Sequence, residues 1–553
     1  MAALVLMSIL AAESSLPAEL SAKSKRGMVV SVNRQASDVG LEMLKRGGNS
    51  VDAAVATALA LAVAHPPAGN IGGGGFMMIL PSGGKPICID YREVAPAAAH
   101  KDLFARGADR HAAVMVGVPG TLRGLELAHE KFGKLKWGEL VAPAVKLARA
   151  GFAIDKDLAK SLNAILESSP EHAEMQRVFR KPGGGKWQAG DLLRQPELAA
   201  TLEQIERSGV QAFYEGAIAE KLVAEMRASG GLITLEDLKQ YRAVVREPIG
   251  CKFRGYDVYG PPPPSSGGIA LAEMLQVFER LELRRQGRFA PATLHTMIET
   301  MKRAFRDRAA HLGDPAFAKI PLDLISPQHV AEVAQSIDPQ LATPSAELAR
   351  EIPLAGEGES TTHFSVIDAE GLAVSNTYTL EESYGSRIVV RGAGFLLNNE
   401  MGDFNWRPGH TDRKGAIGTS PNLIAPGKRM LSSMTPTIVV KDGKPVLITG
   451  SPGGRTIINT VACMLVNVLE YDMDLVEATA APRMHHPWFP DLVKMERRGG
   501  LPAEETIAAL RKLGHQVEWN AAQGNVCSIR VLEGGEFHGV AEPREYDGKA
   551  AGW

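Results

Sequence analysis

The chain has 553 residues, of which 45% are hydrophobic and 22% charged, and this ordinary globular composition excludes a disordered chain or a coiled coil. Lys and Arg number 61 against 63 Asp and Glu, so no overall field draws the protein to nucleic acid or to an anionic membrane. The length fits several domains or one large layered enzyme.

The N-terminal segment, residues 1–26, has part of an export signal. Residues 2–12 are uncharged and mostly apolar, but no Lys or Arg precedes them. We expect a periplasmic or secreted protein, and a cytoplasmic protein with a frayed or helical N-terminus is the alternative. Residues 53–84 lack Asp, Glu, Lys and Arg, yet His65 and several prolines and glycines interrupt them, so no membrane span is expected.

Four cysteines stand far apart and form no CxxC pair or zinc-ligand spacing. We therefore expect neither a disulfide framework nor a structural metal, and interpret them as small buried side chains. They are Cys88, Cys251, Cys463 and Cys527.

Residues 27–150 mix strand and helix signals, whereas residues 120–350 are mostly helical. The periodicity predicts a strand at 27–32, helices at 36–45 and 52–64, a hairpin at 76–80 and 87–90, and helices at 122–131, 137–150, 196–208, 217–229, 269–283 and 291–312. A proline-rich loop, residues 260–268, interrupts the helices. It is either a stiff loop that fixes Ser265 and Ser266 in place or an inert connector.

Residues 339–360 are rich in Pro, Ala, Glu and Gly and predict a flexible, exposed linker. A β-rich region follows directly. Strands are predicted at 361–368, 372–380, 388–390, 395–397, 437–440, 446–449, 527–532 and 539–540, with a core helix at 457–469. Because runs of strands and runs of helices are segregated, the fold class is α+β.

The junction between Ser360 and Thr361 has two interpretations. Thr is β-branched, so Thr361 suits an ordinary strand start. Alternatively, the Thr361 hydroxyl attacks the carbonyl of residue 360 and cuts the chain. The new α-amine, with a reference pKa of about 7.7–8, would then serve as a base for the hydroxyl of its own residue.

Two further patterns suit acyl transfer. Gly453 and Gly454 precede a predicted helix, where backbone N–H groups can stabilise an oxyanion, although an ordinary tight turn is the alternative. The second pattern is a set of residues suited to an α-amino acid head group, with a surface Arg92–Glu93 ion pair as the alternative. The set comprises Arg92, Ser432 and Ser433 for a carboxylate, and Glu400 and Asp403 for an ammonium.

Together these segments resemble the γ-glutamyltransferase (γ-glutamyltranspeptidase) family of the N-terminal nucleophile hydrolase superfamily. Any one block is weak, but all of them occur in family order from about residue 27 to residue 553. The matching blocks are 47–56 (GGNSVDAAVA), 71–76 (IGGGGF), 92–96 (REVAP), 117–120 (GVPG), 263–268 (PPSSGG), 312–315 (LGDP), 361–366 (TTHFSV), 397–401 (LNNEM), 431–437 (LSSMTPT), 450–454 (GSPGG) and 481–483 (APR).

The resemblance implies a precursor that cuts itself between Ser360 and Thr361. Residues 27–360 would form a large subunit and residues 361–553 a small one, and the two would share a four-layer αββα sandwich as a heterodimer. It also implies a γ-glutamyl donor such as glutathione, and water, an amino acid or a dipeptide as acceptor. No metal or organic cofactor is implied.

Carried over position by position, the resemblance gives each site residue a role. Thr361 is the nucleophile, and Thr379 bonds its amine or hydroxyl. Gly453 and Gly454 form the oxyanion hole. Arg92, Ser432 and Ser433 hold the α-carboxylate of the donor, whereas Glu381, Glu400 and Asp403 hold its α-ammonium.

Two features depart from the family pattern. Many members have Asn where this chain has Glu381, although others have Glu. The lid-like stretch 408–428 has no aromatic residue at its centre, 413–417. The alternatives to a γ-glutamyltransferase are a related acylase acting on a glutaryl or other side-chain amide, and a non-catalytic descendant of the scaffold.

Overall fold

The structure, a computed structural model, describes residues 17, 19–349, 360–544 and 547–553. The apolar segment 2–12 and residues 350–359 of the predicted linker lie outside these described residues. Within the described ranges, no helix combines the length and the apolar character that crossing a bilayer requires.

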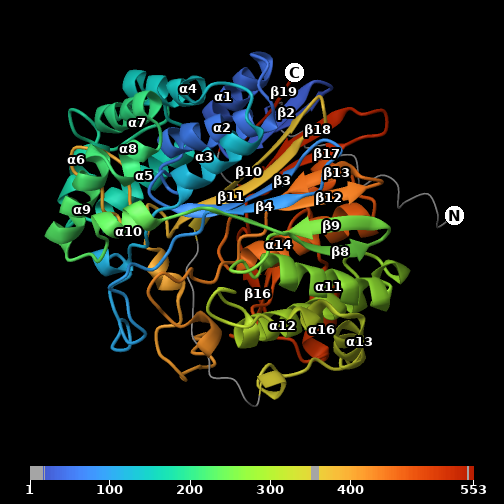
Figure 1. Cartoon of the computed structure of the whole chain (residues 1–553). Helices are drawn as coiled ribbons and strands as arrows, with labels where there is room; N and C mark the ends of the chain where they lie inside the picture. Colours follow the sequence, from blue (N-terminus) through green and yellow to red (C-terminus); the bar gives the residue numbers. More distant parts are fainter. Residues whose placement is uncertain (1–16, 18, 350–359, 545–546) are drawn as a thin grey trace.

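Two stacked antiparallel sheets of seven strands form the centre of the molecule (Figure 1). One sheet runs in the order β19 (Lys549–Gly552), β2 (Gly27–Ser31), β10 (Ser360–Asp368), β11 (Ala373–Glu381), β3 (Gly74–Leu80), β4 (Ile87–Asp90) and β7 (Val244–Arg246). The other runs β1 (Ser21–Ser24), β18 (Phe537–Ala541), β17 (Cys527–Val531), β13 (Lys444–Thr449), β12 (Thr437–Lys441), β9 (Tyr256–Gly260) and β8 (Ile249–Phe253).

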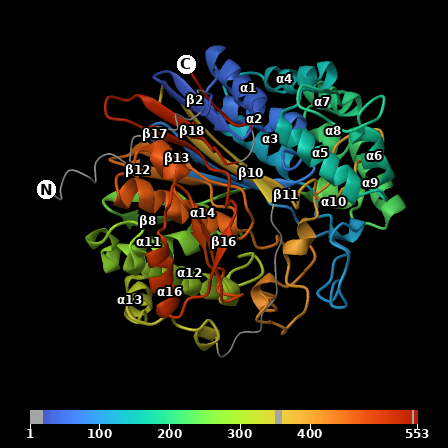
Figure 2. The same ribbon diagram turned by 180° about the vertical axis from the view of Figure 1, so that it is seen from behind.

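Helices cover the outer face of each sheet, which confirms the predicted α+β fold with four αββα layers (Figures 1 and 2). The layer beside β2, β10 and β3 comprises α1 (Arg34–Lys45), α2 (Ser50–Ala64), α3 (Thr121–Phe132), α4 (Trp137–Ala150), α5 (Lys156–Ser168), α6 (Ala173–Phe179), α7 (Pro196–Ser208), α8 (Gln211–Tyr214), α9 (Ala217–Ser229) and α10 (Leu235–Gln240). The opposite layer comprises α11 (Gly267–Leu281), α12 (Pro291–His311), α13 (Pro327–Gln335), α14 (Thr456–Leu465), α15 (Leu475–Ala480) and α16 (Glu504–Lys512).

The Ala-rich helix α2 shows why this sequence can support such layers. All fifteen of its residues are buried, because small side chains let α1 and α4 pack closely on either side of it. Its N-terminus is closed by a capping box, in which the Asn49 side chain accepts from the backbone of Asp52 and the Asp52 carboxylate accepts from the backbone of Asn49.

Strands from both sides of the 360–361 junction are interleaved in each sheet. β10 lies between β2 and β11, and β11 pairs with β3, so the two strands from after the junction lie between strands from before it. The C-terminal strand β19 pairs with β2 on its other edge. Neither part can therefore form its sheets alone.

Polar contacts join the two sheets close to the start of β12 and the end of β13. The Ser375 hydroxyl donates to the Thr449 carbonyl oxygen at 2.9 Å, and the Ser365 hydroxyl donates to that of Cys527 at 2.9 Å. A Cβ on Gly450 would lie 2.3 Å from the His363 ring, so only glycine lets the chain leave β13 at this point.

Several local predictions differ from the structure. Strands predicted at 388–390 and 395–397 are only an isolated bridge between Val389 and Leu396. The helix predicted at 457–469 is α14 followed by a π-helical turn, Val466–Glu470. The sequence did not indicate a three-stranded sheet of β14 (Met484–His485), β15 (Val493–Glu496) and β16 (Val517–Asn520), or a small pair, β5 (Phe152–Ala153) with β6 (Leu192–Leu193).

The first part of the predicted linker is anchored at two points, although several of its residues, Leu341 among them, are exposed as predicted. Ser345 is buried, its N–H donates to the Asp491 carboxylate at 2.7 Å, and its carbonyl oxygen accepts from the Trp488 indole at 3.0 Å. The Ala342 N–H donates to the Leu513 carbonyl oxygen at 2.7 Å. The segment approaching residue 350 is thus fixed to the C-terminal part of the chain.

Candidate active site

A cavity lies where β10 begins and β11 ends. It gathers residues that are up to 365 positions apart in the sequence, since Arg92 and Ile457 both line it. Its lining comprises Arg92, Thr361, Thr379, Glu381, Glu400, Asp403, Ser432, Ser433, Met434, Gly454 and Ile457. Every predicted site residue except Ser360 and Gly453 is therefore part of one cavity.

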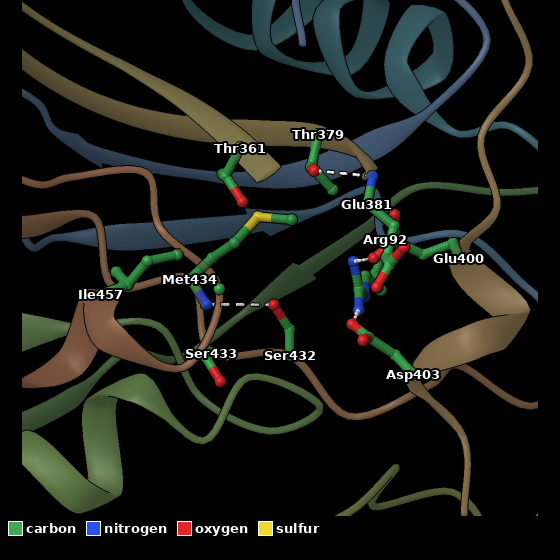
Figure 3. A pocket seen from close by; sticks show the side chains of 11 residues that line it. Arg92, Thr361, Thr379, Glu381, Glu400, Asp403, Ser432, Ser433, Met434 and Ile457 are labelled. Carbon is green, nitrogen blue, oxygen red and sulfur yellow. Dashed lines mark hydrogen bonds and ion pairs between the residues drawn. The ribbon is translucent and has the colours of Figure 1, made fainter. Parts of the chain in front are cut away.

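Thr361 lies at the start of β10 and its hydroxyl is directed into the cavity (Figure 3). Ser360 pairs with Glu381 and Thr362 pairs with Tyr378, so a register shift leaves both Thr379 and Leu380 opposite Thr361. Such an irregularity re-aims side chains at the end of a strand. The bond between residues 360 and 361 lies within β10.

Arg92 occupies the other side of the cavity and is fully buried. Its guanidinium forms ion pairs with Glu400 and, at 2.5 Å, with Asp403. It also donates to the carbonyl oxygens of Met430 at 3.3 Å and Leu431 at 3.2 Å. The alternative of a surface Arg92–Glu93 pair is wrong about the location, because the two residues do form an ion pair at 3.7 Å but both side chains are buried.

The cavity holds more carboxylates than its arginine can neutralise. Burial raises the pKa of both Glu400 and Glu381 well above the usual carboxyl range, and neighbouring acids add to this effect. One oxygen of Glu400 and one of Glu381 are buried without a hydrogen-bond partner among the described residues. These two spare acceptors suit a ligand that carries an ammonium group, whose positive charge would favour the ionised form of both acids.

Glu93, directly behind Arg92, makes the stability of the protein depend on pH. Burial raises its pKa to about 7 against the opposing attraction of Arg92. The folded chain then binds more protons than the unfolded chain at mildly acidic pH, so the stabilisation is complete below the ordinary carboxyl pKa and is lost as the pH rises through about 7.

We therefore expect Glu93→Gln to flatten the pH dependence of the free energy of unfolding. Between about pH 5 and pH 8, the change in this free energy should become smaller by on the order of 1–3 kcal/mol. Urea denaturation at several pH values measures this change. Glu130→Gln, at an exposed position of α3, is the control that should leave the slope intact. An unaltered slope in the Glu93 variant would mean that Glu93 is ionised throughout this range.

Ser432 and Ser433 lie in the loop before β12 and are braced from behind by the proline-rich loop. The Ser266 hydroxyl donates to the Ser432 carbonyl oxygen at 2.6 Å, and the Ser265 hydroxyl donates to that of Met434 at 2.6 Å. Arg308 on α12 donates to the Ser433 hydroxyl at 3.0 Å. The loop 260–268 is therefore a support for the cavity wall rather than an inert connector.

Gly453 and Gly454 form the turn between β13 and α14. Their φ values are +127° and +52°, and a Cβ on Gly453 would lie 2.5 Å from the Thr456 hydroxyl. Glycine is thus required for conformation at this turn. Gly454 lines the cavity at the N-terminal end of α14, where the helix dipole favours negative charge.

No sequence motif marks Arg110, which holds Glu381 in place. The Arg110 guanidinium donates to one Glu381 oxygen at 2.7 Å and to a Glu382 oxygen at 2.7 Å, and it lies 5.5 Å from the centre of the Trp406 ring. Glu381 itself has a φ of +81°, a conformation that is unfavourable for Glu and better tolerated by Asn. Arg110 thus helps to keep this acid at a strained position beside the cavity.

The lid-like stretch 408–428 is attached to the glycine turn. Arg455, next to Gly454, donates to the Gly415 carbonyl oxygen at 3.2 Å, and the Gly409 N–H donates to the Gly418 carbonyl oxygen at 2.8 Å. Ile417, in the non-aromatic centre, is buried. An aliphatic side chain therefore packs where the sequence lacks an aromatic one.

Comparison with known proteins decides the family. The profile of the family described as Gamma-glutamyltranspeptidase matches residues 36–553. The chain is 44% identical to a glutathione hydrolase proenzyme of Escherichia coli (strain K12) over 96% of its length and 92% of that protein. A glutathione hydrolase proenzyme of Pseudomonas aeruginosa is 41% identical, over 94% of this chain and 93% of that protein.

The chain belongs to the gamma-glutamyltranspeptidase family. The resemblance drawn from the sequence motifs is thereby confirmed. Among solved structures, a cephalosporin acylase from Bacillus halodurans has a TM-score of 0.86 at 27% identity, covering 96% of this chain and 97% of that one. The gamma-glutamyltranspeptidase of Helicobacter pylori has a TM-score of 0.56 at 38% identity, covering 57% of this chain and 93% of that one.

Proposed function

We propose that this member of the gamma-glutamyltranspeptidase family cuts itself before Thr361 and then transfers γ-glutamyl groups from glutathione and related amides. The observation that carries the proposal is the cavity itself, in which a strand-end hydroxyl faces a paired guanidinium and carboxylates with spare acceptors. The names of the curated relatives, glutathione hydrolase proenzymes, support both parts of it.

The self-cleavage begins with attack of the Thr361 hydroxyl on the carbonyl carbon of residue 360. The resulting ester is hydrolysed, leaving a carboxylate on residue 360 and a free amine on Thr361. Its reference pKa of about 7.7–8 leaves a useful neutral fraction at physiological pH. This amine can therefore accept the proton of its own hydroxyl when substrate is attacked.

Donor recognition uses the opposite charges of the cavity. Arg92, with Ser432 and Ser433, receives the α-carboxylate of the γ-glutamyl group. Glu400, Asp403 and Glu381 receive its α-ammonium. A zwitterionic head group brings one charge of each sign, so it can replace part of the existing Arg92 ion pairs without leaving a buried charge uncompensated.

Catalysis then proceeds in two halves. Thr361 attacks the γ-carbonyl carbon, the N–H groups of Gly453 and Gly454 stabilise the oxyanion, and Thr379 holds the Thr361 amine or hydroxyl. The departing amine takes the proton that the α-amine received. Water, an amino acid or a dipeptide attacks the γ-glutamyl ester, which returns the Thr361 hydroxyl.

Initial rates on paired anilides test the donor. We expect γ-glutamyl anilide to be turned over about 100-fold faster than glutaryl anilide, because glutarate lacks the ammonium and would leave the acids unpaired. Addition of a dipeptide should divert the γ-glutamyl group into a new peptide, seen by mass spectrometry. Equal or faster turnover of the glutaryl compound would favour the acylase, a fold relative at 27% identity.

A non-catalytic scaffold is the remaining alternative. The threonine and both glycines that acyl transfer requires are present, which argues against it. The intact mass of purified protein separates the two cases, since a chain that stays whole and inactive would favour the scaffold.

We also propose that residues 27–360 and 361–553 form a heterodimer. We further propose that residues 1–26 guide export, which fractionation of cells expressing the full chain would test.

Arg110 offers a test of the ammonium-binding acids. Arg110→Met removes the cation that faces Glu381, so this carboxyl becomes harder to ionise and attracts the donor ammonium less. We expect KM for γ-glutamyl anilide to rise about tenfold with kcat changed little. Arg106→Met, at an exposed position of the same loop, is the control. An unchanged KM would exclude Glu381 from donor binding.

A further inference from the structure

Three metal-ligating side chains meet outside the cavity, between three helices of one layer. Glu273 lies on α11, Asp307 on α12 and His329 on α13. One ligand atom from each lies within 4.8 Å of the others. Nε2 of His329 is 3.1 Å from an Asp307 carboxylate oxygen and 3.7 Å from a Glu273 carboxylate oxygen.

Glu273 is the member of the cluster whose hydrogen bonding is incomplete. Its side chain is fully buried, with 0% exposure, and neither carboxylate oxygen has a hydrogen-bond partner among the described residues. A buried carboxylate without hydrogen bonds is costly, since it has lost its hydration without replacement. The ion pair with His329, at 3.7 Å, is too long to supply a hydrogen bond.

The rest of the cluster is already oriented by its neighbours. The second oxygen of Asp307 accepts from Arg306, which leaves the oxygen near His329 directed toward the cluster. The hydroxyl of Ser326 caps α13 by accepting from the His329 backbone N–H at 3.2 Å. The His329 side chain is 22% exposed, so the cluster is in contact with solvent on the His329 side.

We infer that Glu273, Asp307 and His329 bind one divalent first-row transition-metal ion of the Zn²⁺ type. Tetrahedral zinc with bonds of about 2.0–2.2 Å places neighbouring ligand atoms about 3.3–3.5 Å apart, and the two observed separations bracket this range. One imidazole favours zinc over Mg²⁺ or Ca²⁺, which take mainly oxygen ligands in larger number. Water would complete the coordination.

Such an ion would join α11, α12 and α13 behind the cavity wall. Asp307 directly precedes Arg308, which donates to the hydroxyls of Ser266 and Ser433. The ion would thus stabilise the layer that supports the serine loop, and no chemical step is assigned to it. The inference is independent of the proposed γ-glutamyl transfer.

Calorimetric titration of metal-stripped, full-length protein with ZnCl₂ tests the inference, with the thermal midpoint as a second readout. We expect one Zn²⁺ per chain and a rise of several degrees in the midpoint, because an ion that binds only the folded chain stabilises it. Both effects should be lost in Glu273→Gln and in His329→Gln. His311→Gln, at an exposed histidine of α12, should behave as the unsubstituted protein does.

The circular dichroism spectrum without metal checks that each variant is folded, and His329→Gln alone decides the result should the buried Glu273→Gln chain misfold. Absence of zinc binding by the unsubstituted protein overturns the inference. Zinc binding that survives both substitutions overturns it as well, by locating the ion elsewhere. Parallel titrations with MgCl₂ and CaCl₂ complete the test, since binding of these ions but not of zinc would contradict the metal class.

Discussion

Thr361→Ala is expected to leave one uncut chain of about 59 kDa without detectable γ-glutamyl anilide turnover. The substitution removes the hydroxyl on which both the backbone cleavage and the acyl transfer depend, so the rate should fall by at least about 10⁴-fold. A denaturing gel and a stopped assay on the same preparation measure both effects. Thr361→Ser retains a hydroxyl and should be cut, although more slowly.

Thr362→Val is the matched control for this prediction. Thr362 is the next residue of β10, is buried, and its hydroxyl has no hydrogen-bond partner among the described residues. Valine has nearly the same shape, so this variant should be cut and active. Two fragments from the Thr361→Ala chain would contradict cleavage by the Thr361 hydroxyl.

Arg92→Met should reduce kcat/KM for γ-glutamyl anilide by about 10³-fold and destabilise the fold by about 3–5 kcal/mol. The variant leaves the buried Glu400 and the partly buried Asp403 with no guanidinium between them, and an uncompensated buried charge is the most expensive outcome of breaking such a pair. Arg92→Lys keeps the charge but cannot bridge two carboxylates, so we expect an intermediate loss.

Comparison with a donor that lacks the α-carboxylate separates the loss of carboxylate recognition from the loss of folding in these variants. The unsubstituted enzyme should prefer γ-glutamyl anilide to 4-aminobutyryl anilide, and Arg92→Met should lose most of this preference. Arg246→Met, which breaks the ion pair between Arg246 of β7 and Asp90 of β4, should retain this preference. A preference that survives in Arg92→Met would assign carboxylate recognition to other residues.

The site was largely predictable because its chemistry is concentrated in short motifs. Thr361, the Gly453–Gly454 turn and the serine pair each stand in a distinctive local sequence, and each lies at or beside the cavity. The buried helix α2 was equally clear, since a run of small apolar residues can only be a core helix.

What could not be predicted depends on contacts between distant segments. Arg110 lies in a loop without a motif, and only the fold brings it to Glu381, 271 positions away. Likewise, the sequence cannot distinguish a buried Arg92 from a surface one, because burial is decided by segments that meet it from residues 400 to 431. The short strands of the β14–β15–β16 sheet are too brief for periodicity to indicate them.

The position of β10 and β11 between β2 and β3 within one sheet has a consequence for the proposed cleavage before Thr361. If the backbone is cut there, the two fragments stay interleaved, and neither can leave without breaking the hydrogen bonds of β10 to β2 and of β11 to β3. Two differently tagged preparations mixed after maturation should therefore yield no hybrid molecules. Each molecule would then retain the two polypeptides that were cut from its own precursor.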